Sequence, residues 1–411
     1  MPGDIPAPAS TEDLLRTLTP QVLGSLMHRF GDFDTAEDAL QEALLAAATQ
    51  WQTQGLPDDP LAWLIRVAHR RMVDMVRAEA ARRRREIAVA DRDVADAAPS
   101  DHDDTLTLLF LCCHPILSPA AAIALTLRAV GGLGTAQIAH AFLLPESTVA
   151  QRITRAKKKL ATLDHPFAQP DDRQWRERLG AALRVLYLIF TEGHTTSTGP
   201  ALQRTDLSDE AIRLTRTVHR LLPEDPEVTG LLALMLLTDA RRAARTGEHG
   251  ELIPLAEQNR ALWDRTLITE GTTLITGTLA AGLRGPYQIQ AAIAVLHAQA
   301  TRTENTEWST VLALYERLER YEDNPMVTLN RAVATSMISG PEAGLALVET
   351  LDKRLAGTHR LDAVRGHLHE MAGDLDTAAA CYVRAAAHTT NTPERDYLTI
   401  RAARLRRSGP R

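Results

Sequence analysis

Aromatic residues are scarce in this 411-residue chain, where Phe, Trp and Tyr together make up 4% of the composition. Ala, Leu and Arg are abundant instead, which favours packed helices over sheets. Long apolar runs are also lacking: the longest strong one, residues 231–237, is followed by Asp239 and Arg241, so we expect no membrane span. The three cysteines are too few for a disulfide framework and predict reduced thiols in the cytoplasm.

Sequence motifs for catalysis and cofactor binding are missing as well. No Walker motif and no nucleophile elbow occurs, and residues 1–10 lack the basic start and apolar centre of a secretory signal. Cys112 and Cys113 are adjacent, which does not suit tetrahedral zinc, and His367 and His369 would point apart on a helix. We therefore expect no catalytic residue, no metal and no cofactor, and we interpret the adjacent cysteines as small core residues.

Acidic residues are absent from residues 147–160, although the whole chain has a net charge of −6. Two helices are predicted at 135–142 and from Pro145 onward, joined by a turn at 143–145, with Pro145 at the first helical position. The second helix has one apolar stripe at helical spacing, made of Val149, Ile153, Ala156 and Leu160. This pattern indicates a helix-turn-helix that can enter a DNA major groove; the alternative is a solvated basic face on a core helix.

A second candidate surface is acidic and lies near the N-terminus. Asp34, Asp38, Gln41 and Glu42 share roughly one face of a predicted helix, with Asp34 or Thr35 as its N-cap. One interpretation is a docking surface for a basic partner. The other is a solvated acidic helix start that the helix dipole favours.

A third candidate surface lies on a predicted helix over residues 61–85. Trp63, Arg66, Arg70, Asp74 and Arg77 form an outer stripe opposite an apolar one, and we expect Trp63 to be exposed. An aromatic ring among guanidinium groups suits stacking on unpaired bases, although a basic helix can also simply be solvated. Residues 86–104 are rich in acid and predict a flexible linker.

From residue 171 onward the pattern is amphipathic helices joined by short Pro/Gly/Asp turns. Gly366, Ala378, Tyr382 and Ala385 approximate the small and large alternation of tetratricopeptide repeats, and residues 325–351 are a looser copy. Such arrays bind partners through a concave face. The alternative is a closed helical bundle whose periodicity is incidental.

In this order, the segments resemble a bacterial sigma factor of the extracytoplasmic-function type. Residues 34–43 look like the region-two helix that binds the clamp coiled coil of RNA polymerase. Residues 63–77 look like the helix that melts the minus-10 element, and residues 135–160 look like the region-four reader of the minus-35 element. The family has Gly where this turn has Leu143. The remainder resembles a subgroup with a tetratricopeptide-like helical extension.

The resemblance implies an all-α protein in four parts. These are sigma region 2 at 10–85, an acidic linker at 86–104, region 4 at 105–165 and a regulatory extension at 171–411. The implied partners are core RNA polymerase, through its clamp coiled coil and flap, and promoter DNA, with no membrane. We also expect an intramolecular contact between the extension and the sigma domains.

The resemblance further implies three sets of site residues. The minus-35 set is Glu146, Ser147, Thr148, Gln151, Arg152 and Arg155, with Lys157, Lys158 and Lys159 on phosphate. The minus-10 set is Trp63, Arg66, Arg70, Arg71 and Arg77, beside a loop at 52–59 where a flipped base is held. The polymerase-binding set is Asp34, Asp38, Gln41 and Glu42.

Two other functions remain open on the sequence. One is a stand-alone helix-turn-helix regulator whose repeat domain is a sensor; it would bind duplex DNA without polymerase. The other is a helical enzyme with the first domain as a docking module. Against the enzyme, Glu192, His194, Asp239, Glu270 and His297 form no recognisable pair, and isolated groups of this kind on helices are usually structural.

Overall fold

The computed structural model describes residues 11–86, 104–163 and 172–408, apart from His249 and Glu322. This part of the chain is almost wholly helical, and its only named strands are β1 (Thr198–Gly199) and β2 (Thr390–Asn391). The all-α prediction is therefore confirmed. The chain divides into two compact units, Met1–Leu186 and Tyr187–Arg411, called here unit 1 and unit 2.

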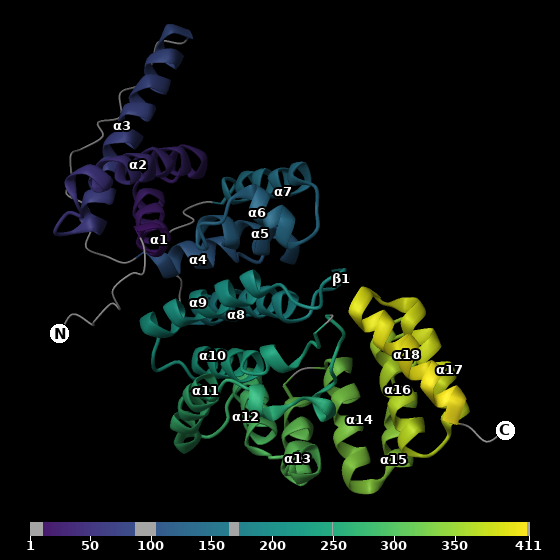
Figure 1. Cartoon of the computed structure of the whole chain (residues 1–411). Coiled ribbons are helices and arrows are strands. Elements are labelled where there is room, and N and C mark those ends of the chain that lie inside the picture. The colour runs from purple at the N-terminus through teal and green to yellow at the C-terminus, as the bar shows by residue number, and fades with distance from the viewer. Residues whose placement is uncertain (1–10, 87–103, 164–171, 249, 322, 409–411) are drawn as a thin grey trace. The chain divides into compact units, whose positions relative to one another are not determined.

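Unit 1 begins with three helices, α1 (Thr11–Phe30), α2 (Phe33–Gln54) and α3 (Pro60–Glu86), which pack on one another (Figure 1). Leu23, Leu40, Leu64 and Met72 are fully buried among them, as the helical spacing predicts. The chain continues as α4 (Thr105–Cys112), α5 (Pro119–Ala129), α6 (Thr135–Ala141) and α7 (Glu146–Leu160). Both α4 and α5 contact α1, so the two helical groups form one unit.

Two predicted helix starts need correction. The N-cap of α2 is Asp32, not Asp34 or Thr35, because the Asp32 carboxylate accepts the backbone N–H groups of both those residues, at 3.2 and 3.3 Å. Pro145 is the N-cap of α7 rather than its first helical residue, since its ψ of 138° is extended. The predicted start of α2 is two or three residues too late, and the predicted role of Pro145 is in error by one position.

The predicted linker is also partly corrected, at its last residue. Residues 87–103 lie outside the described part of the chain, but Asp104 is 2% exposed and its carboxylate lies 3.4 Å from His28 Nδ1. A Cβ atom on Gly24 would come within 2.9 Å of Asp104. The absence of a side chain at Gly24 therefore lets α1 approach the backbone of Asp104 closely, and Asp104 belongs to the core.

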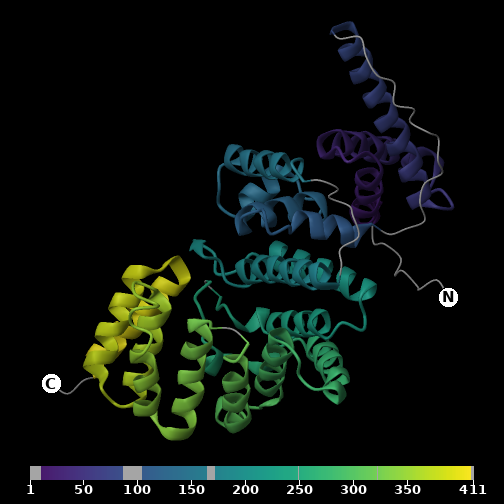
Figure 2. The same cartoon turned by 180° about the vertical axis from the view of Figure 1, so that it is seen from behind.

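Unit 2 starts within α8 (Asp172–His194) and continues with helices that pack mainly on their sequence neighbours. Figures 1 and 2 show α12 to α18 following one another along this unit. The remaining helices are α9 (Thr205–Leu221), α10 (Pro226–Asp239), α11 (Arg265–Thr278), α12 (Pro286–Gln299), α13 (Trp308–Leu318), α14 (Pro325–Ser339), α15 (Pro341–Glu349), α16 (His359–Met371), α17 (Leu375–His388) and α18 (Thr392–Ser408).

Close helix contacts in unit 2 occur where the predicted repeats have small residues. Gly366 of α16 lies against α17, where a Cβ atom would come within 2.9 Å of the Tyr382 ring. In α15, a Cβ atom on Gly344 would lie 2.8 Å from the carbonyl oxygen of Ala332 in α14. Both predicted repeats are thus helical hairpins, and the C-terminal part of the chain is a helical-repeat region.

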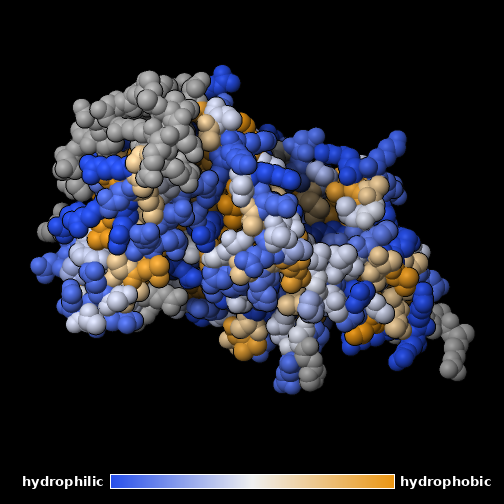
Figure 3. Space-filling model, turned by 90° about the horizontal axis from the view of Figure 1, so that it is seen from above, coloured by the Kyte–Doolittle hydropathy of each residue, from blue (hydrophilic) through white to orange (hydrophobic). Residues whose placement is uncertain are grey.

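One face of the molecule is mostly polar (Figure 3). Figure 3 shows a face on which hydrophilic residues predominate and hydrophobic ones are scattered in small groups. Among the described residues, no helix combines the length and apolar character needed to cross a membrane.

Candidate nucleic-acid and partner interface

The turn between α6 and α7 sets the direction of the basic helix. Leu143 in this turn has a φ of 51° and is the one non-glycine residue with positive φ in the described part of the chain. Its neighbour Leu144 donates a backbone hydrogen bond to Ala139 at 2.9 Å, which closes the turn. The left-handed conformation explains why glycine suits this position, because a side chain is strained there.

The apolar stripe of α7 lies in the core as predicted, with Val149, Ile153, Ala156 and Leu160 all at most 6% exposed. The rest of the helix faces outward. Most of the predicted minus-35 residues are at least partly accessible to solvent. Five of them are exposed, namely Glu146, Ser147, Gln151, Arg155 and Lys158, and Thr148 and Arg152 are half-buried. The exposed Lys159 donates to the carbonyl oxygen of Ile116 at 3.3 Å. The helix therefore presents a continuous polar and basic face to solvent.

Lys157 is an exception, because it is already paired within unit 1. Its ammonium lies 2.8 Å from Asp34 Oδ1, also bonds Glu37, and sits 5.0 Å from the ring centre of Phe33. Burial lowers the pKa of Lys157, but the hydrogen bonds to Asp34 and Glu37 outweigh it and leave the pKa raised. Glu37 also pairs with Arg128 of α5. Asp34, which was predicted to bind polymerase, and Lys157, which was predicted to bind phosphate, are therefore paired with each other.

The acidic face of α2 extends beyond Asp34. Asp38, Gln41 and Glu42 are exposed, and Leu45 on the same face is 68% exposed. Sequence reasoning missed Leu45, because an apolar residue in an amphipathic helix is ordinarily assigned to the core. Its position three residues after Glu42, on the acidic side, is the signal that could have placed it. The face combines carboxylates with one large apolar side chain, a combination typical of a protein-docking surface.

The basic face of α3 carries Arg66, Arg70, Arg71 and Arg77, all exposed. Arg71 Nε lies 3.2 Å from Glu42 Oε2, so this residue links the minus-10 set to the acidic face. Trp63 is half-buried rather than exposed, since its ring packs edge-on against Trp51 with centroids 5.4 Å apart. This corrects the prediction and leaves only part of the indole for stacking. In the preceding loop, Leu56 is 55% exposed.

The described cysteines and histidines were predicted to be structural rather than metal ligands. Among the residues that the structure describes, no group of three or more His, Cys, Asp or Glu side chains could hold an ion. Cys112 and Cys113 are buried, as expected for core residues, and burial raises the pKa of Cys113 to about 12.

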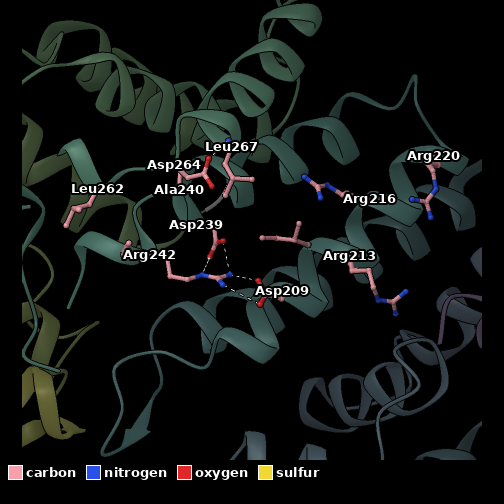
Figure 4. Close-up of a pocket in the computed structure, with 12 residues that line it drawn as sticks. Asp209, Arg213, Arg216, Arg220, Asp239, Ala240, Arg242, Leu262, Asp264 and Leu267 are labelled. Atoms are coloured by element: carbon pink, nitrogen blue, oxygen red, sulfur yellow. Dashed lines mark hydrogen bonds and ion pairs between the residues drawn. The ribbon is translucent and has the colours of Figure 1, made fainter. Parts of the chain in front are cut away.

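Unit 2 contains a cavity of about 740 Å³ lined by arginine and aspartate side chains (Figure 4). Arg242 lies between Asp209 and Asp239 and bonds both carboxylates. Arg213 pairs with Glu210 at 2.7 Å, and Arg216 pairs with Glu270 at 2.7 Å. Burial raises the pKa of Asp239, and Arg242 opposes that shift. The charges of this cavity therefore largely satisfy one another.

Comparison with known proteins connects these regions to families. A family model described as sigma-70 region 2 matches residues 14–82, and one described as sigma-70, region 4 matches residues 107–160. A third, a family of unknown function (DUF6596), matches residues 178–279. The uncharacterized protein R00370 of Rhizobium meliloti (strain 1021) is 43% identical over 399 residues, which cover 94% of this chain and 93% of that protein.

A solved structure was also compared. The crystal structure of yeast Tom70 aligns over 97% of this chain and 84% of that chain, at 12% identity and a TM-score of 0.35. A score of this size is too low for any conclusion about fold or function to rest on it.

Proposed function

Because this chain belongs to the sigma-70 family, as an extracytoplasmic-function sigma factor with a C-terminal extension, we propose that it uses three surfaces of unit 1 to direct RNA polymerase to particular promoters. The family acts in transcription initiation through core polymerase and promoter DNA, and its sigma regions are non-catalytic. The observation that carries the finer proposal is the pair of surfaces in unit 1. One is the acidic face of α2 with Leu45, and the other is the basic outward face of α7.

Core polymerase binds the acidic face of α2, made of Asp34, Asp38, Gln41 and Glu42. Leu45 inserts as an apolar anchor, since interfaces concentrate their binding energy in a few well-packed side chains surrounded by polar ones. The two regions proposed from the sequence each contain one of these surfaces completely. Residues 10–85 contain the acidic face of α2, and residues 105–165 contain the basic face of α7.

The upstream promoter element is read by α7. Gln151, Arg152 and Arg155 reach base edges, while Lys158 and Lys159 neutralise phosphate. The melted downstream strand lies along Arg66, Arg70 and Arg77 of α3, next to the predicted loop at 52–59 with its exposed Leu56. The first three residues of that predicted loop are the end of α2, so the loop itself is 55–59. Opening exchanges base stacking for these contacts and needs no nucleotide site.

Both macromolecules compete with a contact inside unit 1. Polymerase would bind the Asp34 carboxylate that also holds Lys157, and Lys157 can meet phosphate only after it leaves both Asp34 and Glu37. Polymerase bound to Asp34 therefore favours the release of Lys157 to DNA, because it weakens one of the two ion pairs that hold this lysine. The extension at 171–411 acts as a built-in regulator of these sigma domains or of polymerase. A chain truncated after residue 165 that initiates with the same strength and control as the full chain would contradict this role.

The decisive experiment is competition of the full chain with the housekeeping sigma factor for core polymerase. We expect the wild-type chain to displace it, and the Asp34→Ala/Asp38→Ala/Glu42→Ala variant to bind about 100-fold more weakly. The matched control is Glu316→Ala/Glu349→Ala/Asp376→Ala, which removes the same charge from exposed positions of unit 2 and should bind normally. Binding of duplex promoter DNA without any binding of polymerase would favour the stand-alone regulator instead.

A further inference from the structure

A second cavity in unit 2, of about 390 Å³, differs in character from the arginine and aspartate cavity of Figure 4. It lies among α10, α12, α13 and α14, which are neighbouring helices in Figure 1. Apolar side chains line it, among them Leu234, Ile293, Leu318 and Val327. Polar side chains line it too, among them Arg241, which follows the end of α10. The cavity thus combines apolar and cationic side chains.

The guanidinium of Arg241 is half-buried at the cavity and has no counter-charge among the described residues. Within the described residues, no ion pair or side-chain hydrogen bond involves Arg241, and no carboxylate lines the cavity. Its chain neighbour Arg242, by contrast, holds two carboxylates. Burial, followed by repulsion from Arg260, lowers the pKa of Arg241 to about 10. The group still carries its charge at neutral pH, and a desolvated charge with no partner is costly to maintain.

The other groups that line this cavity with Arg241 include uncharged polar ones and a second guanidinium, that of Arg360. Burial raises the pKa of Tyr315 to about 12, so its hydroxyl keeps a proton to donate. Burial, with Arg241 and Arg260, lowers the pKa of His297 to about 4, so this ring is neutral at pH 7. Asn330 adds an amide to the same cavity. Hydrogen-bond donors therefore surround an uncompensated positive charge.

We propose that this cavity binds a small organic acid, whose carboxylate pairs with Arg241 and whose apolar body lies against Leu234, Ile293 and Leu318. A guanidinium fork matches a carboxylate in two parallel hydrogen bonds. The cavity volume falls in the range of small-molecule sites, which combine mostly apolar walls with a few convergent polar groups. The cavity of Figure 4 is less suited, because an anion there must first displace the carboxylates already bound to its arginines.

The test uses the purified full chain without polymerase, so its outcome is independent of the proposed sigma activity. Hexanoate, benzoate and 3-phenylpropanoate are titrated by calorimetry and thermal melting, each beside its uncharged amide. We expect at least one acid to bind and raise the melting temperature, and its amide to bind more weakly. Arg241→Gln should weaken that acid about 10- to 100-fold, as loss of a charge-assisted bond predicts, and should raise the melting temperature of the ligand-free chain.

Two further variants make the result decisive. Tyr315→Phe removes one hydroxyl and should weaken the acid several-fold, which also decides the matter if Arg241→Gln fails to fold. Arg220→Gln removes a guanidinium from the cavity of Figure 4 and should leave binding unchanged. The proposal is overturned if no acid binds more tightly than its amide, or if Arg241→Gln and Tyr315→Phe both bind the acid as the wild-type chain does.

Discussion

The two units of this molecule pair their charged side chains differently. In unit 1, Asp104 is buried, but the ion pairs on the proposed binding faces join helices far apart in sequence and include exposed carboxylates, such as Asp34, which holds Lys157. In unit 2, carboxylates and guanidiniums are drawn into cavity walls, where Asp239 is 6% exposed and Arg241 has no counter-charge among the described residues. Surface pairs can be exchanged for an external macromolecule at little cost, whereas an enclosed charge suits a small ligand. The same chemical groups thus serve two kinds of recognition.

The largest loss of stability is expected from Asp239→Ala, which removes a buried carboxylate of unit 2. The change leaves Arg242 beside a buried, empty position, so the free energy of unfolding should fall by about 3 kcal/mol. Asp209→Ala removes the other partner of Arg242, but that carboxylate is 61% exposed, and a loss of at most about 1 kcal/mol is expected. Denaturant unfolding measures both. Equal losses would mean that burial does not distinguish the two pairs.

Low pH should decrease the stability of unit 2, because His297 binds a proton more readily in the unfolded chain than in the folded one. Its folded-state pKa of about 4 lies below the ordinary value of 6.5, so the unfolded chain binds more protons between these values. Stability should therefore be complete above about pH 6.5 and should fall by roughly 2–3 kcal/mol as the pH approaches 4. Thermal melts of the full chain over this window check the slope. His297→Asn should flatten it, whereas His140→Asn, at an exposed position of α6, should not.

A pair of changes in α7 separates base reading from phosphate binding. Arg152→Ala should relax base preference in the upstream element by about 1–3 kcal/mol. Lys158→Ala should weaken all sequences about equally and lower the salt dependence of binding by about one counter-ion. Affinities for matched and scrambled promoters, with polymerase present and over several salt concentrations, measure both. Equal effects of the two changes on specificity would reject these roles.

The smallest effect is expected from Lys157→Ala. Lys157 and Glu37 are only 11% and 12% exposed, but Glu37 keeps Arg128 as a partner and Asp34 is 74% exposed, so the loss of stability should be about 1 kcal/mol. The contact between α7 and α2 should nevertheless open more often, which hydrogen exchange in the first turn of α2 would detect. Lys157→Arg keeps the charge and is the control. Unchanged exchange in Lys157→Ala would show that this pair does not hold the two helices together.

The sequence predicted what depends on helical spacing. The core stripe of α7, the all-α fold, the hairpin with Gly366 and the burial of Cys112 follow from residues near one another in the chain. It missed what depends on distant neighbours. Asp104 is buried because Gly24 lies against it, and the cavity around Arg241 joins residues of separate helices. The spacing of Leu45 from Glu42 places it on the acidic side of α2, but its exposure also depends on distant neighbours, since an apolar residue on a helix is exposed only if nothing packs over it. The site residues of α2, α3 and α7 stay predictions until binding is measured.

One small feature of unit 2 bears on how this region folds. The Asn391 side chain next to α18 donates hydrogen bonds to the backbone and hydroxyl oxygens of Thr196, 195 positions earlier, and β1 and β2 pair in parallel beside it. Helical arrays ordinarily fray from an end, since each repeat touches only its neighbours. Here the contact between Asn391 and Thr196 joins the last hairpin of the unit to its first part, and so closes a very long loop. Closing this loop costs chain entropy, so the contact should form late in folding. Because it links the two ends of the unit, it should also make unfolding a single cooperative event.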